Sequence, residues 1–419
     1  MNWIREYVDL PKDRNEIISL IQRFTLSTAE VEDIYIKGDD LHGVVIGQIV
    51  ALEAHPNSSK LHLLKVDTGD RVRNIVCGAP NVALGQKVAL AVSGSRVPGK
   101  DINTATVAGY ESEGMCCSEA ELGISDDASG LMVIPDDAPL GADIKTLWDI
   151  DDIVFEVDNK SLTNRPDLWG HYGIAREFAA LTAGKLKPLD LADELADKTG
   201  KGRTDIVPVD IRNTDLVYRY TCLRMSGITK QVSPVNMRIR LYYCGMRAIN
   251  LLADLTNYIM LELGQPTHAF NASKVNSIAV GTPEKELDFK TLDGTERKIG
   301  TNTLLIYNNE LPVGIAGIMG GLDSEIVENT GSVVLESANF DGVSIRKSST
   351  ALGLRTDASM RYEKVLDPEL TMLAVKRFVK LLCDIDAGAY IDSALNDVYV
   401  KKYPTITISF DKRFVDRYT

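Results

Sequence analysis

A stretch near the C-terminal end of the chain, residues 335–364, concentrates side chains that could hold a polar ligand. It reads LESANFDGVSIRKSSTALGLRTDASMRYEK and combines acids, hydroxyl groups and a tight cluster of charges. Glu336 directly follows the short apolar run 333–335, so we expect a strand end to aim its carboxylate from a rigid element. Residues 356–359 are expected on a later loop opposite the acid. The residue types therefore predict a polar pocket rather than a piece of core.

One histidine, His268, could shuttle a proton or donate a hydrogen bond to a sugar. Apolar residues keep a helical spacing over 251–262 until Gly264, so we expect His268 just past the end of a helix that carries Thr256 and Asn257. Each candidate also has a structural reading. A histidine after a helix is often a satisfied structural residue, and a single glutamate such as Glu336 often caps a helix or pairs with a cation. The residue types alone leave both readings open.

Glycines are dense in the segment GIAGIMGG, residues 314–321. Their spacing matches neither the phosphate-binding loop that ends in Gly-Lys-Ser/Thr nor the Gly-x-Gly-x-x-Gly dinucleotide fingerprint. Such glycines let a backbone approach a ligand and expose N–H donors, although a tight structural turn explains them equally well. The chain also lacks a Gly-x-Ser-x-Gly elbow and a Ser-His-Asp order, so the sequence supports neither nucleotide phosphate binding nor a nucleophilic hydrolase.

The composition limits the class of protein. The chain has 419 residues, 44% of them hydrophobic and 25% charged, which suits about two to four globular domains. Six cysteines form no C-x-x-C pair and five histidines form no H-E-x-x-H motif, which predicts reduced thiols and no protein-built metal site. The first 24 residues carry scattered charges and no apolar block, so we expect no secretory signal, no membrane span and a cytoplasmic location.

The charge balance opposes non-specific nucleic-acid binding by the chain as a whole. Its 46 Lys and Arg against 59 Asp and Glu leave a formal charge of −13. Basic residues do cluster locally, over 219–247 and 346–364, but solvated surfaces explain each cluster taken alone. Any contact with RNA must therefore be local.

The first half of the chain shows two kinds of pattern. Residues 1–39 read as a small helical opening. From Val44, short β-rich segments separated by turn signals suit a five-stranded oligonucleotide-binding (OB) barrel. Residues 172–183 predict an amphipathic helix ended by Gly184.

The second half begins after the polar stretch 191–205, which predicts a linker and a domain boundary. Helical spacings over 239–246, 251–262 and 367–382 alternate with strand and loop signals, which predicts a mixed α+β architecture. A strand-like pattern starts at Thr405 and stops without a terminating element, so the chain looks truncated.

Six segments, in this order along the chain, together resemble one family, the bacterial phenylalanyl-tRNA synthetase β subunit. They are HPNSSKLHLLKVDTG, ESEGMCCSEAELG, NRPDLWGHYGIAREFAAL, DLTNYIMLELGQPTHAF, PVGIAGIMGG and LESANFDGVSIRKSSTALGLRTDASMRYEK. HPNSSKL with GMCCSEAELG alone would indicate only a tRNA-binding barrel that several proteins share. All six in order span essentially the whole chain, so the resemblance is specific to the family.

The resemblance implies a multidomain α+β fold. Residues 1–39 and 151–200 would form a small, discontinuous N-terminal α/β domain. An OB-fold tRNA-binding barrel at 40–150 would be inserted in it, and a mixed α+β editing domain would occupy 206–400. Residues 401–419 would start a following, truncated domain.

The resemblance also implies the catalytic residues of an editing site, which hydrolyses tyrosine wrongly esterified to phenylalanine tRNA, tRNA(Phe). Glu336 matches the acid that accepts the hydrogen of the tyrosine phenol. His268 matches a histidine near the tRNA 3′ end and the attacked ester. Thr356 and Ala358 match positions that shape the pocket near the ester. A positioned water would attack the ester carbonyl, because no activated side-chain nucleophile is evident.

Four further residues are implied to bind the substrate. Thr256 and Asn257 would line the amino-acid pocket, with Ala316 on its wall, and the backbone around Gly317 would add a contact near the phenol. Hydroxyl recognition belongs in such a site, because an apolar pocket rejects an added hydroxyl only about a hundredfold, whereas a hydrogen-bonding site discriminates by about ten thousandfold or more.

The implied partners are the synthetase α subunit, in an α2β2 heterotetramer, and tRNA(Phe). ATP and magnesium serve the full enzyme, which aminoacylates through the α subunit, and the resemblance implies no cofactor and no metal for this fragment. The family's DNA-binding-like, catalytic-like and anticodon-binding modules have no counterpart in the sequence. Two hypotheses follow: the fragment is an editing hydrolase, or it is a non-catalytic module for tRNA binding and subunit assembly.

Overall fold

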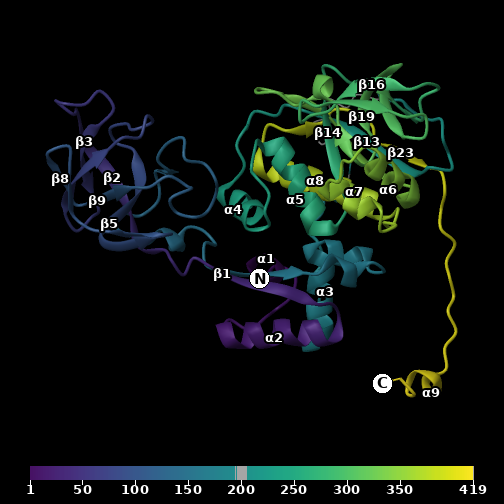
Figure 1. Cartoon of the computed structure of the whole chain (residues 1–419), viewed down its shortest axis with the longest axis horizontal. Coiled ribbons are helices and arrows are strands. Elements are labelled where there is room, and N and C mark those ends of the chain that lie inside the picture. The colour runs from purple at the N-terminus through teal and green to yellow at the C-terminus, as the bar shows by residue number, and fades with distance from the viewer. Residues whose placement is uncertain (194, 196–204, 419) are drawn as a thin grey trace.

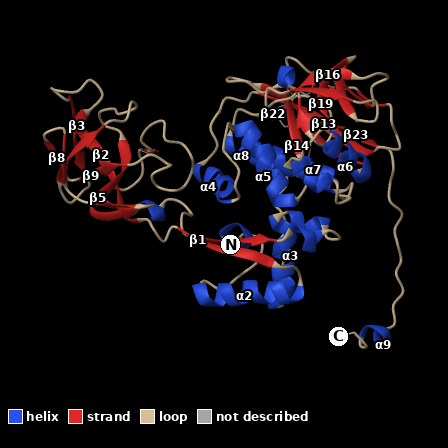
Figure 2. Cartoon of the chain, in the orientation of Figure 1, coloured by secondary structure: helices blue, strands red, loops and turns tan. Residues whose placement is uncertain are grey.

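Figure 1 shows the computed structural model of the chain, which describes residues 1–193, 195 and 205–418. The ribbon separates into a sheet domain at the left of the view, a small N-terminal unit at lower centre and a larger C-terminal body at the upper right. Strands dominate the sheet domain, whereas helices lie beneath a strand-rich layer in the C-terminal body (Figure 2). The fold is mixed α+β. The predicted linker at 191–205 lies largely outside the described residues.

Two segments far apart in the sequence build the N-terminal unit. Strand β1 pairs antiparallel with β11, with Ile36 opposite Ile153, so the sheet domain is inserted between two halves of one unit. Helix α3 ends in a left-handed residue, but this is Ala183 (φ 52°) rather than the predicted Gly184. The elements of the unit are α1 (Asn2–Arg5), α2 (Arg14–Ser27), β1 (Val31–Lys37), β11 (Asp152–Val157), η2 (Asn159–Leu162), η3 (Pro166–Trp169) and α3 (His171–Thr182).

The sheet domain is built around the long, bent strands β2 and β5. Its strands follow the order β10-β5-β2-β3-β4, and β6 and β9 also pair with β5. The strands are β2 (His42–Ala54), β3 (His62–Asp67), β4 (Val72–Cys77), β5 (Lys87–Val97), β6 (Lys100–Ile102), β7 (Ala105–Val107), β8 (Tyr110–Ser112), β9 (Gly114–Cys116) and β10 (Val133–Ile134), followed by η1 (Ile144–Thr146).

The predicted OB barrel is not confirmed by these pairings. Among the described strands, no ladder joins the outer strand β4 to β9 or β10. The two sides approach each other at single bonds, where the Glu113 amide donates to the Asn74 carbonyl at 2.9 Å and the Val76 amide donates to Ser112 Oγ at 3.0 Å. The sheet curls toward itself without a continuous closing ladder.

The C-terminal body contains two five-stranded sheets. One has the order β14-β21-β13-β22 with β23 also on β13, and the other has the order β12-β15-β18-β19-β20. Its strands are β12 (Val209–Ile211), β13 (Val217–Ser226), β14 (Thr267–Asn271), β15 (Ile278–Gly281), β16 (Leu287–Lys290), β17 (Glu296–Ile299), β18 (Leu305–Asn308), β19 (Leu311–Ile315), β20 (Met319–Gly320), β21 (Ser332–Phe340), β22 (Tyr390–Ile391) and β23 (Asn396–Tyr399). Its helices are α4 (Val235–Tyr243), α5 (Leu251–Leu263), η4 (Leu322–Ser324), α6 (Gly342–Ala351), α7 (Asp357–Tyr362) and α8 (Leu370–Ile385).

Strand β21 is buried on both faces because it lies between two layers. Val333 and Leu335 belong to the core shared with α5 and α8, whereas Val334 and Ala338 belong to the core shared with the second sheet. This alternation is the two-residue period of a strand. Side chains at even positions of β21, including Glu336, therefore face the second sheet.

Three expectations about local structure were wrong. Glu336 lies in the middle of β21 rather than at a strand end. Residues 356–359 do not form a loop, because Thr356 caps helix α7. No strand starts at Thr405 in the described part of the tail, where an extended segment leads to the exposed helix α9 (Lys412–Val415).

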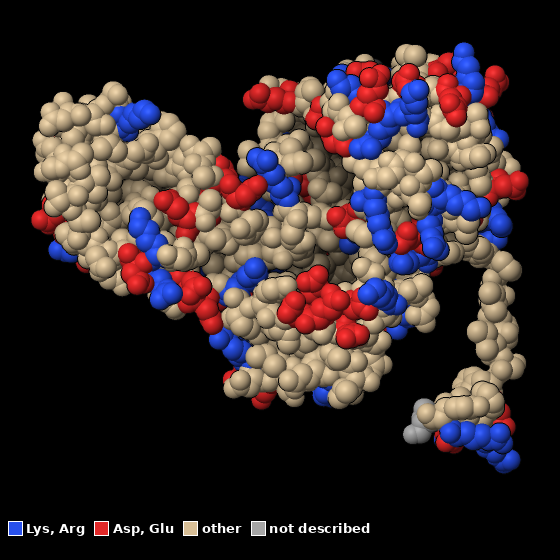
Figure 3. All heavy atoms as spheres, in the orientation of Figure 1, with Lys and Arg blue, Asp and Glu red and all other residues tan. Residues whose placement is uncertain are grey.

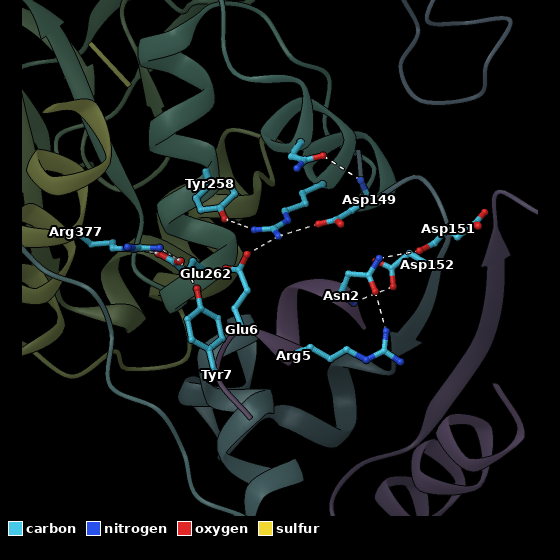
Figure 4. Close-up of polar contacts among 12 residues, drawn as sticks. Asn2, Arg5, Glu6, Tyr7, Asp149, Asp151, Asp152, Tyr258, Glu262 and Arg377 are labelled. Atoms are coloured by element: carbon cyan, nitrogen blue, oxygen red, sulfur yellow. Dashed lines mark hydrogen bonds and ion pairs between the residues drawn. The ribbon is translucent and has the colours of Figure 1, made fainter. Parts of the chain in front are cut away.

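Polar contacts join the N-terminal unit to the C-terminal body (Figure 4). The Tyr7 hydroxyl donates to Glu262 on α5, and the Arg377 guanidinium on α8 holds the same carboxylate through bonds of 2.8 and 2.9 Å. Arg240 on α4 donates to Glu6 at 2.5 Å and to the Tyr258 hydroxyl at 2.8 Å. Helix α5 is thus anchored on its side facing the N-terminal unit.

Among the described helices, none combines the length and apolar character that a membrane span requires. The described Cys, His, Asp and Glu side chains likewise form no group of three or more that could hold a metal ion.

Candidate functional site

The candidate site contains a row of side chains from three neighbouring strands. His268 of β14 lies opposite Glu336 of β21, and Cys222 of β13 lies opposite Glu336 on its other side. Directly opposed residues project to the same face of a sheet, so the three form one cross-strand row. The sheet register thus brings together two residues that the sequence separates by 68 positions, His268 and Glu336.

Glu336 is a buried acid that accepts one side-chain hydrogen bond among the described residues. Only 5% of its surface is exposed. The fully buried Tyr220 of β13 donates its hydroxyl to Glu336 Oε2. Burial raises the pKa of Glu336 to about 7, while the Tyr220 hydrogen bond works against that rise because it favours the carboxylate. The site therefore holds an acid whose charge changes near neutral pH.

His268 is half-buried beside Glu336. Its ring meets Phe270 edge-on, with 4.4 Å between ring centres. Burial lowers the pKa of His268, so the ring is neutral at neutral pH. A neutral imidazole offers one N–H donor and one acceptor nitrogen, so His268 can orient a water or a hydroxyl without carrying charge.

The glycine segment 314–321 forms one wall of the site. Gly317 has a φ of +66°, and a Cβ atom there would lie 2.9 Å from the Tyr362 ring and 3.1 Å from Ile345. A Cβ atom at Gly320 would lie 2.7 Å from His268 Cε1. The backbone conformation and the space at Gly317 therefore favour glycine, and a side chain at Gly320 would have to displace His268.

Thr356 joins the glycine segment to α7. Its hydroxyl accepts from the Ser359 amide in a capping box and donates to the Ile318 carbonyl at 2.9 Å. Ala358, in the first turn of α7, lines both hollows, as His268 does, at the opening that the two hollows share. Thr356 thus positions the wall that carries Ala358.

Two adjoining hollows meet at this opening. The inner hollow, about 70 Å³, includes Glu336 and Gly317 in its wall. The outer hollow, about 560 Å³, includes Thr256, Asn257 and Thr356. The residues common to both walls are Pro266, Thr267, His268, Ile318, Met319, Gly320 and Ala358.

The structure thus brings seven of the eight candidate residues to the walls of the two hollows. Ala316 is the exception, since it is fully buried in the core between the sheets and lines neither hollow. The sequence analysis did not single out Tyr220 or Tyr362, which complete the surroundings of Glu336. Tyr220 lies 116 residues from Glu336, and no local pattern signals that contact.

The arrangement has a defined chemical capacity. The inner hollow ends at a carboxylate that can accept a hydrogen bond from a hydroxyl group, and aromatic and apolar side chains supply much of the remaining wall. A neutral imidazole stands where the inner and outer hollows meet. The geometry fits a ligand with an apolar body, a hydroxyl tip and a polar group at the opening.

Two domain families match the chain. The tRNA binding domain family matches residues 44–143, which is the sheet domain. The B3/4 domain family matches residues 216–387, which includes both hollows and every candidate residue.

Curated proteins match along the whole chain. The phenylalanine–tRNA ligase β subunit of Clostridium acetobutylicum is 37% identical over 424 residues, which cover 100% of this chain and 52% of that protein. The subunit of the same name from Syntrophus aciditrophicus is 39% identical over 391 residues, which cover 93% of this chain and 48% of that protein. The chain spans about half the length of the curated relatives it matches.

Among solved structures, an N-terminal fragment of the phenylalanyl-tRNA synthetase β subunit from Pyrococcus horikoshii is 15% identical. The match covers 48% of this chain and 60% of the Pyrococcus fragment. Its TM-score of 0.27 is too low to support an assignment of the fold.

Proposed function

Because the chain belongs to the phenylalanine–tRNA ligase β-subunit family, we propose that its B3/4 domain removes tyrosine wrongly esterified to tRNA(Phe). The observation that carries the proposal is the pairing of buried Glu336 with His268 where two hollows meet. The inner hollow would take the tyrosine side chain, and the outer hollow would take the end of the tRNA.

Glu336 would provide the selectivity. Tyrosine and phenylalanine differ by one hydroxyl, and a site that hydrogen-bonds this hydroxyl discriminates far better than an apolar pocket can. With phenylalanine in the hollow, the carboxylate would be sealed from water with only its Tyr220 hydrogen bond, which costs several kcal/mol in the charged state. Gly317 would place its backbone near the phenol, since any side chain there would meet Tyr362.

The hydrolytic step would use a water held near His268. The water oxygen adds to the ester carbonyl carbon and gives up a proton, the bond from that carbon to the ribose oxygen breaks, and the ribose oxygen takes a proton in its place. The products are free tyrosine and tRNA with a free terminal hydroxyl. His268 would orient the water through its neutral ring, while Thr356 and Ala358 fix the opposite wall and thereby the position of the ester.

The sheet domain would contribute tRNA contacts, and the α subunit would complete an α2β2 ligase that aminoacylates tRNA(Phe). Figure 3 shows acidic and basic side chains interleaved over the face that it draws, without an extended basic stripe. A formal charge of −13 agrees with weak binding of tRNA by this chain alone. We therefore expect the editing activity of the isolated chain to be limited by tRNA affinity.

A deacylation assay with tyrosyl-tRNA(Phe) and phenylalanyl-tRNA(Phe) tests the proposal. We expect the chain, at high concentration, to release tyrosine faster than phenylalanine. Glu336→Gln should reduce this selectivity by about tenfold or more, since the charged acceptor is lost. His268→Ala should slow hydrolysis of both esters while the circular dichroism spectrum stays unchanged. Glu310→Gln is the matched control, because Glu310 is exposed and pairs with Arg212 away from the hollows.

One outcome would favour the alternative function. If the isolated chain leaves tyrosyl-tRNA(Phe) intact at every concentration while the α2β2 enzyme clears it, the chain by itself is a module for tRNA binding and assembly. Full selectivity in Glu336→Gln would remove Glu336 from hydroxyl recognition.

A further inference from the structure

Tyr220 is the one side chain that donates a hydrogen bond to Glu336 among the described residues, and it is fully buried in the middle of β13. It pairs with Ala338 in the register, so it reaches Glu336 diagonally, from the strand on the side away from His268. The carboxylate therefore lies between a fixed donor on one side and the row neighbour His268 on the other.

The direction of this hydrogen bond is fixed. Burial and the neighbouring carboxylate raise the pKa of Tyr220 well above its usual value, so its hydroxyl keeps its proton and donates it to Oε2. Oε2 must then act as an acceptor. Oε1 is then the carboxylate oxygen that receives no hydrogen bond from the described residues, so it is the better acceptor for a ligand hydroxyl.

Few other groups influence this carboxylate. The titratable side chains around it are Tyr220 and Cys222 from β13, His268 from β14 and Tyr362 from α7. Burial raises the pKa of Cys222 to about 12 and lowers that of His268, so neither is charged at neutral pH. The Tyr362 hydroxyl is bound to the Ala338 carbonyl at 3.1 Å. In the described part of the chain, no Lys or Arg lines the inner hollow.

We propose that Tyr220 is a positioning residue for hydroxyl recognition: it binds Oε2 of Glu336, favours the carboxylate form and leaves Oε1 free to accept the substrate phenol. This inference rests on the proposed editing function. It assigns selectivity to a pair of side chains, with Glu336 contacting the substrate and Tyr220 acting only through Glu336.

Tyr220→Phe tests the proposal, because it removes the hydroxyl and keeps the ring. The first measurement is the titration of the Glu336 carboxyl carbon by ¹³C NMR, with the resonance assigned by its loss in Glu336→Gln. We expect the midpoint to rise by about one pH unit, since the hydrogen bond that favours the carboxylate is gone. Tyr218→Phe is the matched control on the same strand, because the Tyr218 hydroxyl donates to Asp341 instead, at 2.8 Å.

The second measurement is selectivity as a function of pH. For wild type, the preference for tyrosyl over phenylalanyl ester should increase as pH rises through the Glu336 midpoint, and Tyr220→Phe should shift this profile to higher pH. At a pH below the shifted midpoint, KM for the tyrosyl ester should rise about tenfold with little change for the phenylalanyl ester. If Tyr220→Phe has the same preference for the tyrosyl ester and the same Glu336 titration midpoint as wild type, the inference is wrong.

A second variant covers the case in which Tyr220→Phe does not fold. Incorporation of 3-fluorotyrosine at position 220 keeps the hydroxyl and makes it a stronger donor, so the Glu336 midpoint should fall, and an unchanged midpoint would contradict the proposal. The NMR titration also separates this inference from the proposed function. If wild type hydrolyses no tyrosyl ester, the proposed editing function of this chain is wrong. The Glu336 titration midpoints of wild type and Tyr220→Phe still show whether Tyr220 controls the protonation of Glu336.

Discussion

Glu336 occupies a position in β21 where an apolar side chain would stabilise the sheet more. Its neighbours along the strand are buried, and the inner hollow gives the carboxylate little access to water. The cost of a buried charge is offset in part by Tyr220 and would be offset further by a ligand hydroxyl. Glu336 thus lowers the stability of the fold, and its proposed role in binding a ligand explains its presence.

This cost makes a prediction about pH. The pKa of Glu336 rises from 4.5 in the unfolded chain to about 7 in the fold, so the folded chain binds more protons between these values and the residue destabilises the fold as pH rises through that window. Glu336→Gln should therefore gain stability relative to wild type between pH 5 and pH 8, by about 1–3 kcal/mol.

Urea unfolding of both proteins at the two pH values measures this change. Glu310→Gln should show no such dependence on pH. A difference between Glu336→Gln and wild type that stays constant from pH 5 to pH 8 would contradict the raised pKa.

At the scale of elements, the site depends on how the glycine segment packs against α7. Thr356 holds the two together through the Ile318 carbonyl, and Gly317 lets the turn approach Tyr362 within van der Waals contact. A change in this contact would move Ala358 relative to His268. The elements that frame the opening therefore have little freedom to vary.

Gly317→Ala tests this packing. The left-handed conformation should cost about 1 kcal/mol, and the close contacts with Tyr362 and Ile345 should add about 1–3 kcal/mol. Gly353→Ala is the control, since Gly353 also has a positive φ of +59° but nothing lies within 4 Å of its added Cβ. Urea unfolding should show a clearly larger loss for Gly317→Ala, and equal losses would mean that the turn can relax.

Several elements could be predicted from the sequence because their signals are local. Helix α5 ends at Gly264, as the helical spacing and the glycine indicate. Helix α7 was missed because it has only six residues and its capping box uses Ser359 where Glu or Gln is the usual signal.

The contacts across the sheet could not be predicted from local signals. The residue types near Glu336 and His268 indicated a polar site, but the register that sets them side by side depends on strands far apart in the chain. The same is true of Tyr220, which lies 116 residues from Glu336 in the chain. Most of the candidate residues from the sequence line the two hollows, whereas the sequence could not show which of them touch.

At the scale of the whole molecule, the Tyr7 hydroxyl joins the N-terminal unit to a buried ion pair in the body that carries the site. Glu262 is fully buried on α5, where Arg377 and Tyr7 hold its carboxylate (Figure 4). The same helix carries Thr256 and Asn257 on the outer hollow. Movement of the N-terminal unit would therefore displace one wall of the site.

Arg377→Met should destabilise the chain by about 3–5 kcal/mol, because it leaves the Glu262 charge buried without its cation. The double variant with Glu262→Gln should recover much of that loss. Arg176→Met is the control at an exposed pair, 3.3 Å from Asp167, and should cost no more than about 1 kcal/mol. Thermal unfolding measures all three, and a small loss in Arg377→Met would mean that water reaches Glu262.

The pairing of β1 with β11 has a consequence for biosynthesis. Lys37 and its partner Asp152 are separated by residues 38–151, which include the whole sheet domain. At about 5–20 residues per second, a ribosome needs roughly ten seconds to make that interval, so β1 stays unpaired while the sheet domain emerges and folds. The nascent chain therefore carries an open strand edge for that time, which is the stage at which a chaperone would have the greatest effect on its yield.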